Sequence, residues 1–236
     1  MLSRVPRRSD FTYCHLLPVL DRYLAAGQRV LDIGCGTGAV SLYTADRGAG
    51  VLGIDISENA VASCRQSARR LGLDAQARFS ALDFPRETPS GPFDMVVCFE
   101  VLEHLPDDRE AVGVVRGLLA PGGAALFSVP SARAPVHRLR MRLRGTDAFD
   151  AEAGHLRRYT VEQITALLTE GGLAVLEVRR TEGVLRNALY VTATGRFLVR
   201  LVRSFVRGIV TAIDNVLVGL FGESQIIVAT RRQPDE

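Results

Sequence analysis

A short apolar run that leads straight into a glycine-rich turn constrains the fold of this chain more than any other stretch. Residues 28–33 (QRVLDI) end at the turn Gly34–Gly38 (GCGTG), and residues 38–48 then follow a helical pattern. Glycine lets the backbone approach a ligand closely and adopt a positive φ. The helix that follows offers unpaired N–H groups at its N-terminus. This order predicts a strand, turn and helix that can bind a nucleotide-like ligand.

Strand and helix patterns continue to alternate along the chain. Ser57 is a good N-cap for a helix that runs to about Leu71 and closes at Gly72, and Thr160 with Gln163 forms a capping box before a later helix. A further helix is expected from Asp107 or Asp108 to residue 119. The expected strands are residues 28–33, 50–55, 75–81, 93–99, 124–129, 173–179 and 224–230. This alternation predicts an α/β fold with a mostly parallel sheet and helices on both faces.

Two stretches interrupt the alternation without suggesting a second domain. Residues 131–158 are rich in Arg and contain one Pro and two His, so we expect a cap over a site. Residues 183–222 are basic and helical in pattern and form a second insertion. A length of 236 residues fits one α/β domain. We therefore expect a single domain over residues 1–236 with these two insertions.

The nature of the ligand depends on the acids around the turn. Gly34, Gly36 and Ala39 also fit the dinucleotide fingerprint, so the glycines alone are a weak signal. Asp32 lies two residues before the first glycine, where a carboxylate would repel a pyrophosphate and attract an ammonium group. Asp55 ends the second strand, where a carboxylate can accept hydrogen bonds from both hydroxyls of a ribose. These acids favour a ligand that carries a ribose and an amino group.

Five motifs follow one another along the first 130 residues: VLDIGCGTG (30–38), GIDIS (53–57), ALDFP (81–85), FDMVVCFEVLEHLPD (93–107) and LLAPGGAALFSVP (118–130). In this order and spacing they resemble the class I S-adenosylmethionine-dependent methyltransferases, in the branch that includes the ubiquinone-biosynthesis O-methyltransferases. The resemblance implies a Rossmann-like fold with seven strands, the last one antiparallel. It also implies methyl transfer from S-adenosylmethionine to a small-molecule or lipid-linked acceptor, which we expect at oxygen.

The resemblance also assigns residues to the cofactor S-adenosylmethionine. It implies that the glycine turn packs under the methionine part, that Asp55 holds the ribose and that Ile56 lies against the adenine. Asp83 would accept a hydrogen bond from the adenine amino group, with Phe84 beside it, and the strand end at Cys98 would flank the sulfonium. The expected cofactor-binding set is Asp32, Gly34, Cys35, Gly36, Asp55, Ile56, Asp83, Phe84 and Cys98.

Candidates for catalysis lie just after the fourth expected strand and within the cap. Methyl transfer from a sulfonium is an in-line displacement, so alignment supplies much of the rate, and an oxygen acceptor can need a base. Glu100, Glu103 and His104 lie at the sheet edge where a substrate would sit. The related family carries E-V-L-E-H across different acceptors, which favours a structural role for Glu103 and His104. The catalytic candidates are His155, His104 and Glu100, with a role in shaping the site as the alternative for His104.

His155 lies in the sequence GHLRRYT, just before the capped helix. It is either a base or acceptor contact, or a loop histidine with a hydrogen-bond partner. The neighbouring Arg157, Arg158 and Tyr159 can bind an anionic part of the acceptor, with solvated charge as the alternative.

The composition excludes several chemistries. All 29 basic residues are arginine, so no Schiff-base lysine, P-loop lysine or Tyr-x-x-x-Lys pair is possible. The four cysteines have no C-x-x-C and no Cys/His ligand spacing, so we expect no disulfide framework and no metal site, and a reducing cytoplasm.

Three rival functions are weighed against methyl transfer to a small acceptor. An NAD(P)-dependent oxidoreductase is disfavoured by Asp32 and by the missing lysine. A nucleic-acid methyltransferase is disfavoured because there is no Asn-Pro-Pro-Tyr motif and no Pro-Cys nucleophile, and we expect no nucleic-acid partner. A non-catalytic membrane-docked scaffold is disfavoured by the intact cofactor motifs.

The second insertion contains a basic amphipathic stretch at residues 196–221. Apolar residues recur at helical spacing from Phe197 to Leu220, and Arg196, Arg200, Arg203 and Arg207 lie mainly on other faces. Such a helix can lie in an anionic membrane interface, or it can pack on the core or on a second subunit. The N-terminus lacks the apolar core of a signal peptide. We therefore expect a cytoplasmic protein that docks peripherally on the inner face of the membrane.

Overall fold

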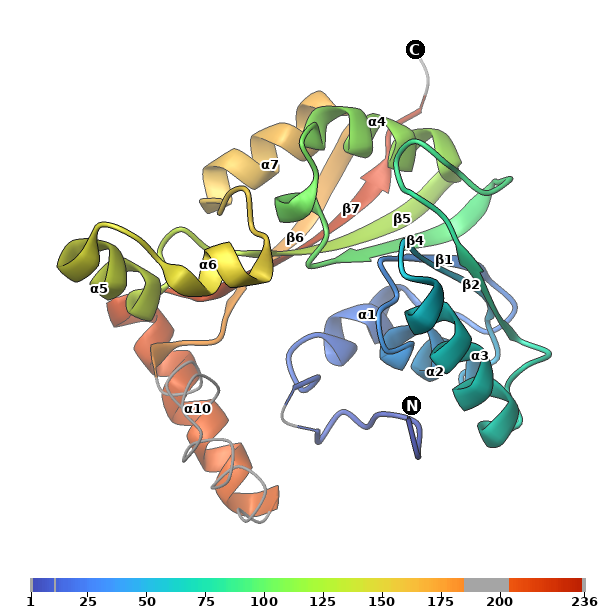
Figure 1. The fold of residues 1–236 in the computed structure, drawn as a ribbon, viewed down its shortest axis with the longest axis horizontal. Helices are drawn as coiled ribbons and strands as arrows, with labels where there is room; N and C mark the ends of the chain where they lie inside the picture. Colours follow the sequence, from blue (N-terminus) through green and yellow to red (C-terminus); the bar gives the residue numbers. More distant parts are fainter. Residues whose placement is uncertain (1, 11, 185–203, 235–236) are drawn as a thin grey trace.

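The computed structural model describes residues 2–10, 12–184 and 204–234, and within them seven strands form one sheet in the order β3-β2-β1-β4-β5-β7-β6 (Figure 1). The strands are β1 (Arg29–Ile33), β2 (Gly50–Asp55), β3 (Ala77–Ala81), β4 (Phe93–Phe99), β5 (Leu119–Pro130), β6 (Leu173–Thr181) and β7 (Gln225–Arg232). The α-helices are α1 (Leu17–Tyr23), α2 (Ala39–Ala45), α3 (Glu58–Leu71), α4 (Asp108–Leu118), α5 (Pro135–Arg144), α6 (Ala148–Ala153), α7 (Val161–Glu170) and α10 (Ser204–Phe221).

Strand directions confirm the predicted sheet. β1 to β5 pair in parallel, whereas β7 runs antiparallel to both β5 and β6. In the register, Ile33 lies opposite Ile54 on one side and Cys98 on the other. The carboxyl ends of β1, β2 and β4 therefore meet at one edge, where folds of this class bind their ligands.

Helices cover both faces of the sheet, as predicted (Figure 1). One buried cluster joins the sheet to α4 and α7 and includes Phe127 and Ile164. The other joins it to α1, α2 and α3 and includes Leu20 and Tyr43. Burial on both faces explains why the central strands read as continuous apolar runs. Each fully buried side chain of this size stabilises the fold by about 1.5–3 kcal/mol.

Helix ends lie where the capping residues predict them. The Ser57 hydroxyl accepts a hydrogen bond from the Ala60 backbone N–H, and Gly72 closes α3 in the left-handed conformation. Thr160 and Gln163 form the reciprocal capping box of α7. β5 is longer than predicted and begins at Leu119, because Leu119 pairs with Phe93 across a register shift. The Pro-Gly-Gly signal at residue 121 therefore lies inside a strand and does not precede it.

The two insertions form helices outside the core layers. The cap at residues 131–158 contains α5 and α6, beside the carboxyl edge of the sheet (Figure 1). α10 belongs to the second insertion and extends away from the sheet (Figure 1). A buried carboxylate fixes it, because Asp214 accepts a hydrogen bond from the Gly183 N–H at 2.7 Å. Residues 196–203 of the predicted amphipathic helix lie outside the described residues. Within the described part of the chain, none of the helices has the length and apolar character needed to cross a membrane.

Candidate active site

The turn after β1 requires glycine at its first position. Gly34 has a φ of +67°, and a side chain there would place its Cβ only 2.4 Å from the Val101 Cγ2 atom. Gly36 also has a positive φ, +51°, but a Cβ there would approach only the Gly34 carbonyl oxygen, at 3.9 Å. The turn is thus packed against the protein at Gly34 and has free space beside Gly36. This is the arrangement that lets a ligand approach the backbone closely.

Asp55 connects the end of β2 to this turn. One carboxylate oxygen accepts a hydrogen bond from the Gly36 N–H at 2.8 Å, and the other accepts one from the Ser57 N–H at 2.9 Å. The side chain of the next residue, Ile56, is 72% exposed although it is large and apolar. A carboxylate and an exposed apolar side chain therefore lie together at the carboxyl edge, which suits a ribose and an adenine ring.

Asp32 lies beneath the turn and not on its surface. Its carboxyl is buried and accepts a hydrogen bond from the Ser41 hydroxyl. Burial raises the pKa of Asp32 to about 7, so the carboxyl carries only part of a negative charge at neutral pH. A positively charged group bound at the turn would favour its ionised form.

The other expected cofactor residues fall into two groups. Asp83 is half-buried and accepts a hydrogen bond from Arg86 at 3.1 Å. Phe84, Cys98 and Cys35 turn their side chains inward, with exposures of 8%, 0% and 7%. Burial raises the pKa of the Cys98 thiol well above its usual value. The assignment of these three residues to the cofactor stays a prediction.

Glu103 is the most unusual ionisable residue at this edge. It is fully buried in the short 3-10 helix Leu102–His104, and neither carboxylate oxygen has a hydrogen-bond partner among the described residues. Burial, and then the charge of Glu100, raise the pKa of Glu103 to about 9. A buried carboxylate without partners is costly, so the site is suited to a proton or a cation.

Two histidines complete a cluster with Glu103. The ring centroids of His104 and His155 are 5.0 Å apart. His104 Nδ1 lies 3.1 Å from the Gly154 carbonyl oxygen, and a carbonyl can only accept, so this nitrogen carries the hydrogen. Ligand atoms of Glu103, His104 and His155 lie within 4.8 Å of one another. This cluster could hold a divalent cation, although its residues are too far apart in sequence for spacing to reveal it. The expectation of a metal-free site stays a prediction.

Glu100 has an unusual backbone conformation next to this cluster. It is not a glycine, yet its φ is +55°, a region that costs about 1–3 kcal/mol. Its Oε1 accepts hydrogen bonds from the Ser128 hydroxyl at 2.8 Å and from the Gln225 amide at 3.1 Å. Donors on β5 and β7 thus hold the carboxylate at the carboxyl edge. Strain of this kind is common at functional sites.

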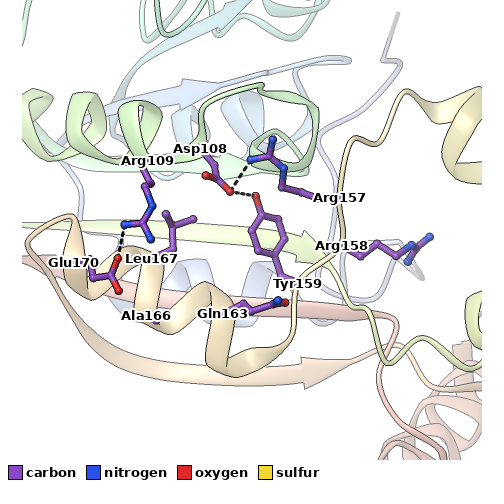
Figure 2. A pocket seen from close by; sticks show the side chains of 9 residues that line it. All are labelled: Asp108, Arg109, Arg157, Arg158, Tyr159, Gln163, Ala166, Leu167 and Glu170. Atoms are coloured by element: carbon purple, nitrogen blue, oxygen red, sulfur yellow. Dashed lines mark hydrogen bonds and ion pairs between the residues drawn. The ribbon is translucent and has the colours of Figure 1, made fainter.

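Arg157, Arg158 and Tyr159 bind acids within the protein. They line a pocket of about 370 Å³ together with residues of α4 and α7 (Figure 2). Asp108 accepts a hydrogen bond from the Tyr159 hydroxyl at 2.8 Å and forms an ion pair with Arg157 at 2.8 Å. Arg158 points away from this pair and binds Asp150 (Figure 2). The structure therefore does not support the expectation that these three groups bind an anionic acceptor.

The residues at the edge fit S-adenosylmethionine. The space beside Gly36, the carboxylate of Asp55, the exposed Ile56 and the buried acid Asp32 match an amino acid, a ribose and an adenine. Asp150, Ser128 and Gln225 orient candidate residues in the structure but could not be identified from the sequence. The one sequence feature that pointed to Asp150 was its position five residues before His155.

Known proteins resemble this chain in sequence and in fold. A family model described as "Methyltransferase domain" matches residues 7–178. A ubiquinone biosynthesis O-methyltransferase of Azoarcus sp. (strain BH72) is 40% identical over 103 residues, 44% of each chain. One from Pseudomonas aeruginosa (strain PAO1) is 37% identical over 128 residues, 52% of this chain and 55% of the relative. The chain thus spans only about half the length of these curated relatives.

Solved structures show that the fold serves more than one reaction. The N-methyltransferase NodS from Bradyrhizobium japonicum WM9, in complex with S-adenosyl-L-homocysteine, has a TM-score of 0.62 at 20% identity. The similarity covers 99% of this chain and 91% of NodS. The [4+2]-cyclase SpnF has a TM-score of 0.65 at 22% identity, with 94% and 82% covered. The fold alone therefore does not fix the reaction.

Proposed function

The chain belongs to the class I S-adenosylmethionine-dependent methyltransferases, and we propose that it methylates an oxygen of a small-molecule or lipid-linked acceptor. The observation that carries the proposal is the cluster of Glu103, His104 and His155, which lies at the same sheet edge as the glycine turn and Asp55. It offers bases for a hydroxyl proton next to a site that fits the methyl donor. The names of the curated relatives also favour oxygen.

The residues of this chain have distinct roles in the proposed reaction. S-adenosylmethionine, when bound, supplies a methyl group on a positively charged sulfur. The turn and Asp55 hold and orient the donor, with Ile56 against its adenine. His155 accepts the proton of the acceptor hydroxyl while the new O–C bond forms and the C–S bond breaks. The products are the methylated acceptor, S-adenosylhomocysteine and a proton on His155.

An acceptor screen tests the choice of oxygen. The protein is incubated with methyl-labelled S-adenosylmethionine and two probes, 3,4-dihydroxybenzoate and 4-aminobenzoate, together with lipid and quinone extracts. We expect label on hydroxyl oxygens, in the phenolic probe or in an extract component. Label found only on nitrogen would contradict the proposal.

We expect His155→Ala to lower the rate of methyl transfer at least tenfold, within the usual range for a lost general base. The affinity for S-adenosylhomocysteine should stay near wild type, because His155 lies in the cap and not at the turn. His137→Ala is a matched control, since His137 also binds Asp150 but lies outside the cluster. Full turnover of the His155 variant would assign His155 a structural role.

We propose further that the second insertion docks the enzyme on the anionic inner face of the membrane. The described part of α10 exposes Ile213 (49%), Val216 (69%), Leu220 (72%) and Phe221 (53%). The first three recur at helical spacing and form an apolar stripe. Four arginines precede this stripe in the sequence, at residues 196–207. Each arginine near an anionic surface adds about 1 kcal/mol of binding free energy, and salt weakens this part.

We expect the wild type to sediment with phosphatidylglycerol vesicles at low salt and to bind pure phosphatidylcholine weakly. Val216→Ser combined with Leu220→Ser should stay in the supernatant, because apolar burial supplies the salt-independent part of binding. Leu176→Ser, an exposed leucine of β6, is the control. If the wild type stays in the supernatant with every lipid, and the double variant converts a dimer to a monomer, the stripe is a subunit interface.

A further inference from the structure

Asp150 in the cap helix α6 is the centre of a network that reaches the proposed reaction site. Its carboxylate lies 2.9 Å from His155 Nδ1 and 3.2 Å from His137 Nδ1. Arg158 donates to both oxygens, with distances of 2.6 Å to Oδ1 and 2.8 Å to Oδ2. The His155 backbone N–H also donates to the Asp150 carbonyl oxygen at 2.9 Å. The position of His155 is therefore fixed at its main chain and at its ring.

The charge state of Asp150 determines which ring nitrogen carries the hydrogen. Arg158 is a permanent cation that donates to both oxygens of Asp150, and such a bidentate pair favours the ionised carboxylate. An ionised carboxylate can only accept hydrogen bonds. The Nδ1 atom of His155 must therefore be the donor, and in the neutral ring the lone pair is on Nε2.

The contacts of Asp150 differ from those of a comparable acid in the cap. The cap contains a second acid, Asp147, which is buried and binds His137 Nδ1 at 2.9 Å and Arg140 at 3.0 Å. This network resembles that of Asp150 in chemistry but does not include His155. Asp150 is the acid whose carboxylate binds the ring of His155 in the cluster of Glu103, His104 and His155. The side chain of His155 is only 10% exposed, so water does not compete strongly for its Nδ1 atom.

We propose that Asp150 is a positioning residue that holds His155 as the Nδ1–H tautomer, so that Nε2 is the base for the acceptor proton. The proposal rests on the proposed function for its catalytic meaning, but the tautomer itself is independent of any acceptor. The carboxylate orients the ring and stabilises the imidazolium that forms when Nε2 takes the proton.

The tautomer is measured directly by long-range ¹H–¹⁵N correlation spectra of the full chain at about pH 8.5, above the usual titration range of imidazole. The chain has four histidines, and His155→Gln assigns the signal of interest. We expect Nδ1–H for His155 in the wild type. In Asp150→Ala the ring should revert to the Nε2–H form that free imidazole side chains favour in water.

Two matched variants separate positioning from damage to the cap. Asp147→Ala removes the carboxylate of the second acid network, and Arg158→Gln breaks the ion pair while it keeps the carboxylate beside His155. Both should leave the His155 tautomer unchanged. An Nε2–H form in the wild type would overturn the proposal, and so would a tautomer change in all three variants.

Turnover supplies the second readout. We expect Asp150→Ala to slow methyl transfer by the same factor as His155→Ala, at unchanged affinity for S-adenosylhomocysteine, and the double variant to lose nothing more. Losses that multiply in the double variant would contradict action through His155. If the wild type methylates no acceptor, the proposed function fails, whereas the spectra still decide whether Asp150 sets the tautomer.

Discussion

We expect Glu103→Gln to make the ligand-free protein more stable than the wild type at pH 8 and to slow methyl transfer. The wild-type carboxyl is fully buried without partners, and its pKa is raised from 4.5 to about 9. The folded state therefore binds more protons than the unfolded state between these two values. Its free energy of unfolding falls as the pH rises through this window. Glutamine has the same shape but no charge to bury.

The size of the effect follows from the width of the window. Three pH units at 1.36 kcal/mol each give a difference between variant and wild type that grows by about 3–4 kcal/mol from pH 5 to pH 8. Urea unfolding at pH 5, 6.5 and 8 measures it. Glu110→Gln, which changes an exposed acid of α4, is the control. If the free energies of unfolding of Glu103→Gln and the wild type change equally with pH, the pKa of Glu103 is not raised in the folded state.

A divalent cation provides a second arm of the same experiment. If Glu103, His104 and His155 bind the ion, it should favour the ionised carboxylate and raise the melting temperature of the wild type at pH 8. The melting temperature of Glu103→Gln should change little when the ion is added. If Mg²⁺, Mn²⁺ and Zn²⁺ leave the melting temperature of the wild type unchanged, the site holds a proton. That result would agree with the expectation of a metal-free site.

We expect Asp55→Ala to weaken S-adenosylhomocysteine binding by about 2–4 kcal/mol, which is roughly 30- to 1000-fold in affinity. The carboxylate is expected to accept two hydrogen bonds from the ribose, and it also orders the turn through the Gly36 N–H. Equilibrium dialysis with labelled ligand measures the loss. Affinity equal to that of the wild type would exclude Asp55 from the ribose site.

Glu58→Ala controls for the loss of charge in this experiment. Glu58 begins α3, three residues after Asp55, and its side chain is exposed. Removal of its charge should change the affinity little, because exposed charges are screened by solvent and salt. An equal loss in both variants would point to a general electrostatic effect and not to a ribose contact.

The fold could be predicted from sequence wherever local signals were complete. β2, β4 and α3 have the predicted bounds, because apolar runs end at glycine or acidic residues and Ser57 and Gly72 cap the helix. The start of β5 could not be predicted, because it depends on pairing with Phe93 in a distant strand. Helix α6 in the cap also lacked a periodic pattern long enough to be recognised.

The candidate site was predictable in its glycine turn and Asp55, since both lie within one strand–turn–helix unit. The cluster of Glu103, His104 and His155 was not, because the cap brings together residues about fifty positions apart. The burial of Glu103 and its missing partners also depend on that packing. Residues that act through long-range contacts, such as Asp150, therefore become visible only in the structure.

Calorimetric titration of the wild type with S-adenosylhomocysteine, and separately with NADH and NADPH, shows which ligand the turn at Gly34 binds. With Asp32 and Asp55 beside it, the turn should be a site for S-adenosylmethionine and not for a pyrophosphate-bridged dinucleotide. We predict one molecule of S-adenosylhomocysteine bound per chain and no heat from either dinucleotide. Tight binding of NADH or NADPH, with none of S-adenosylhomocysteine, would contradict the account.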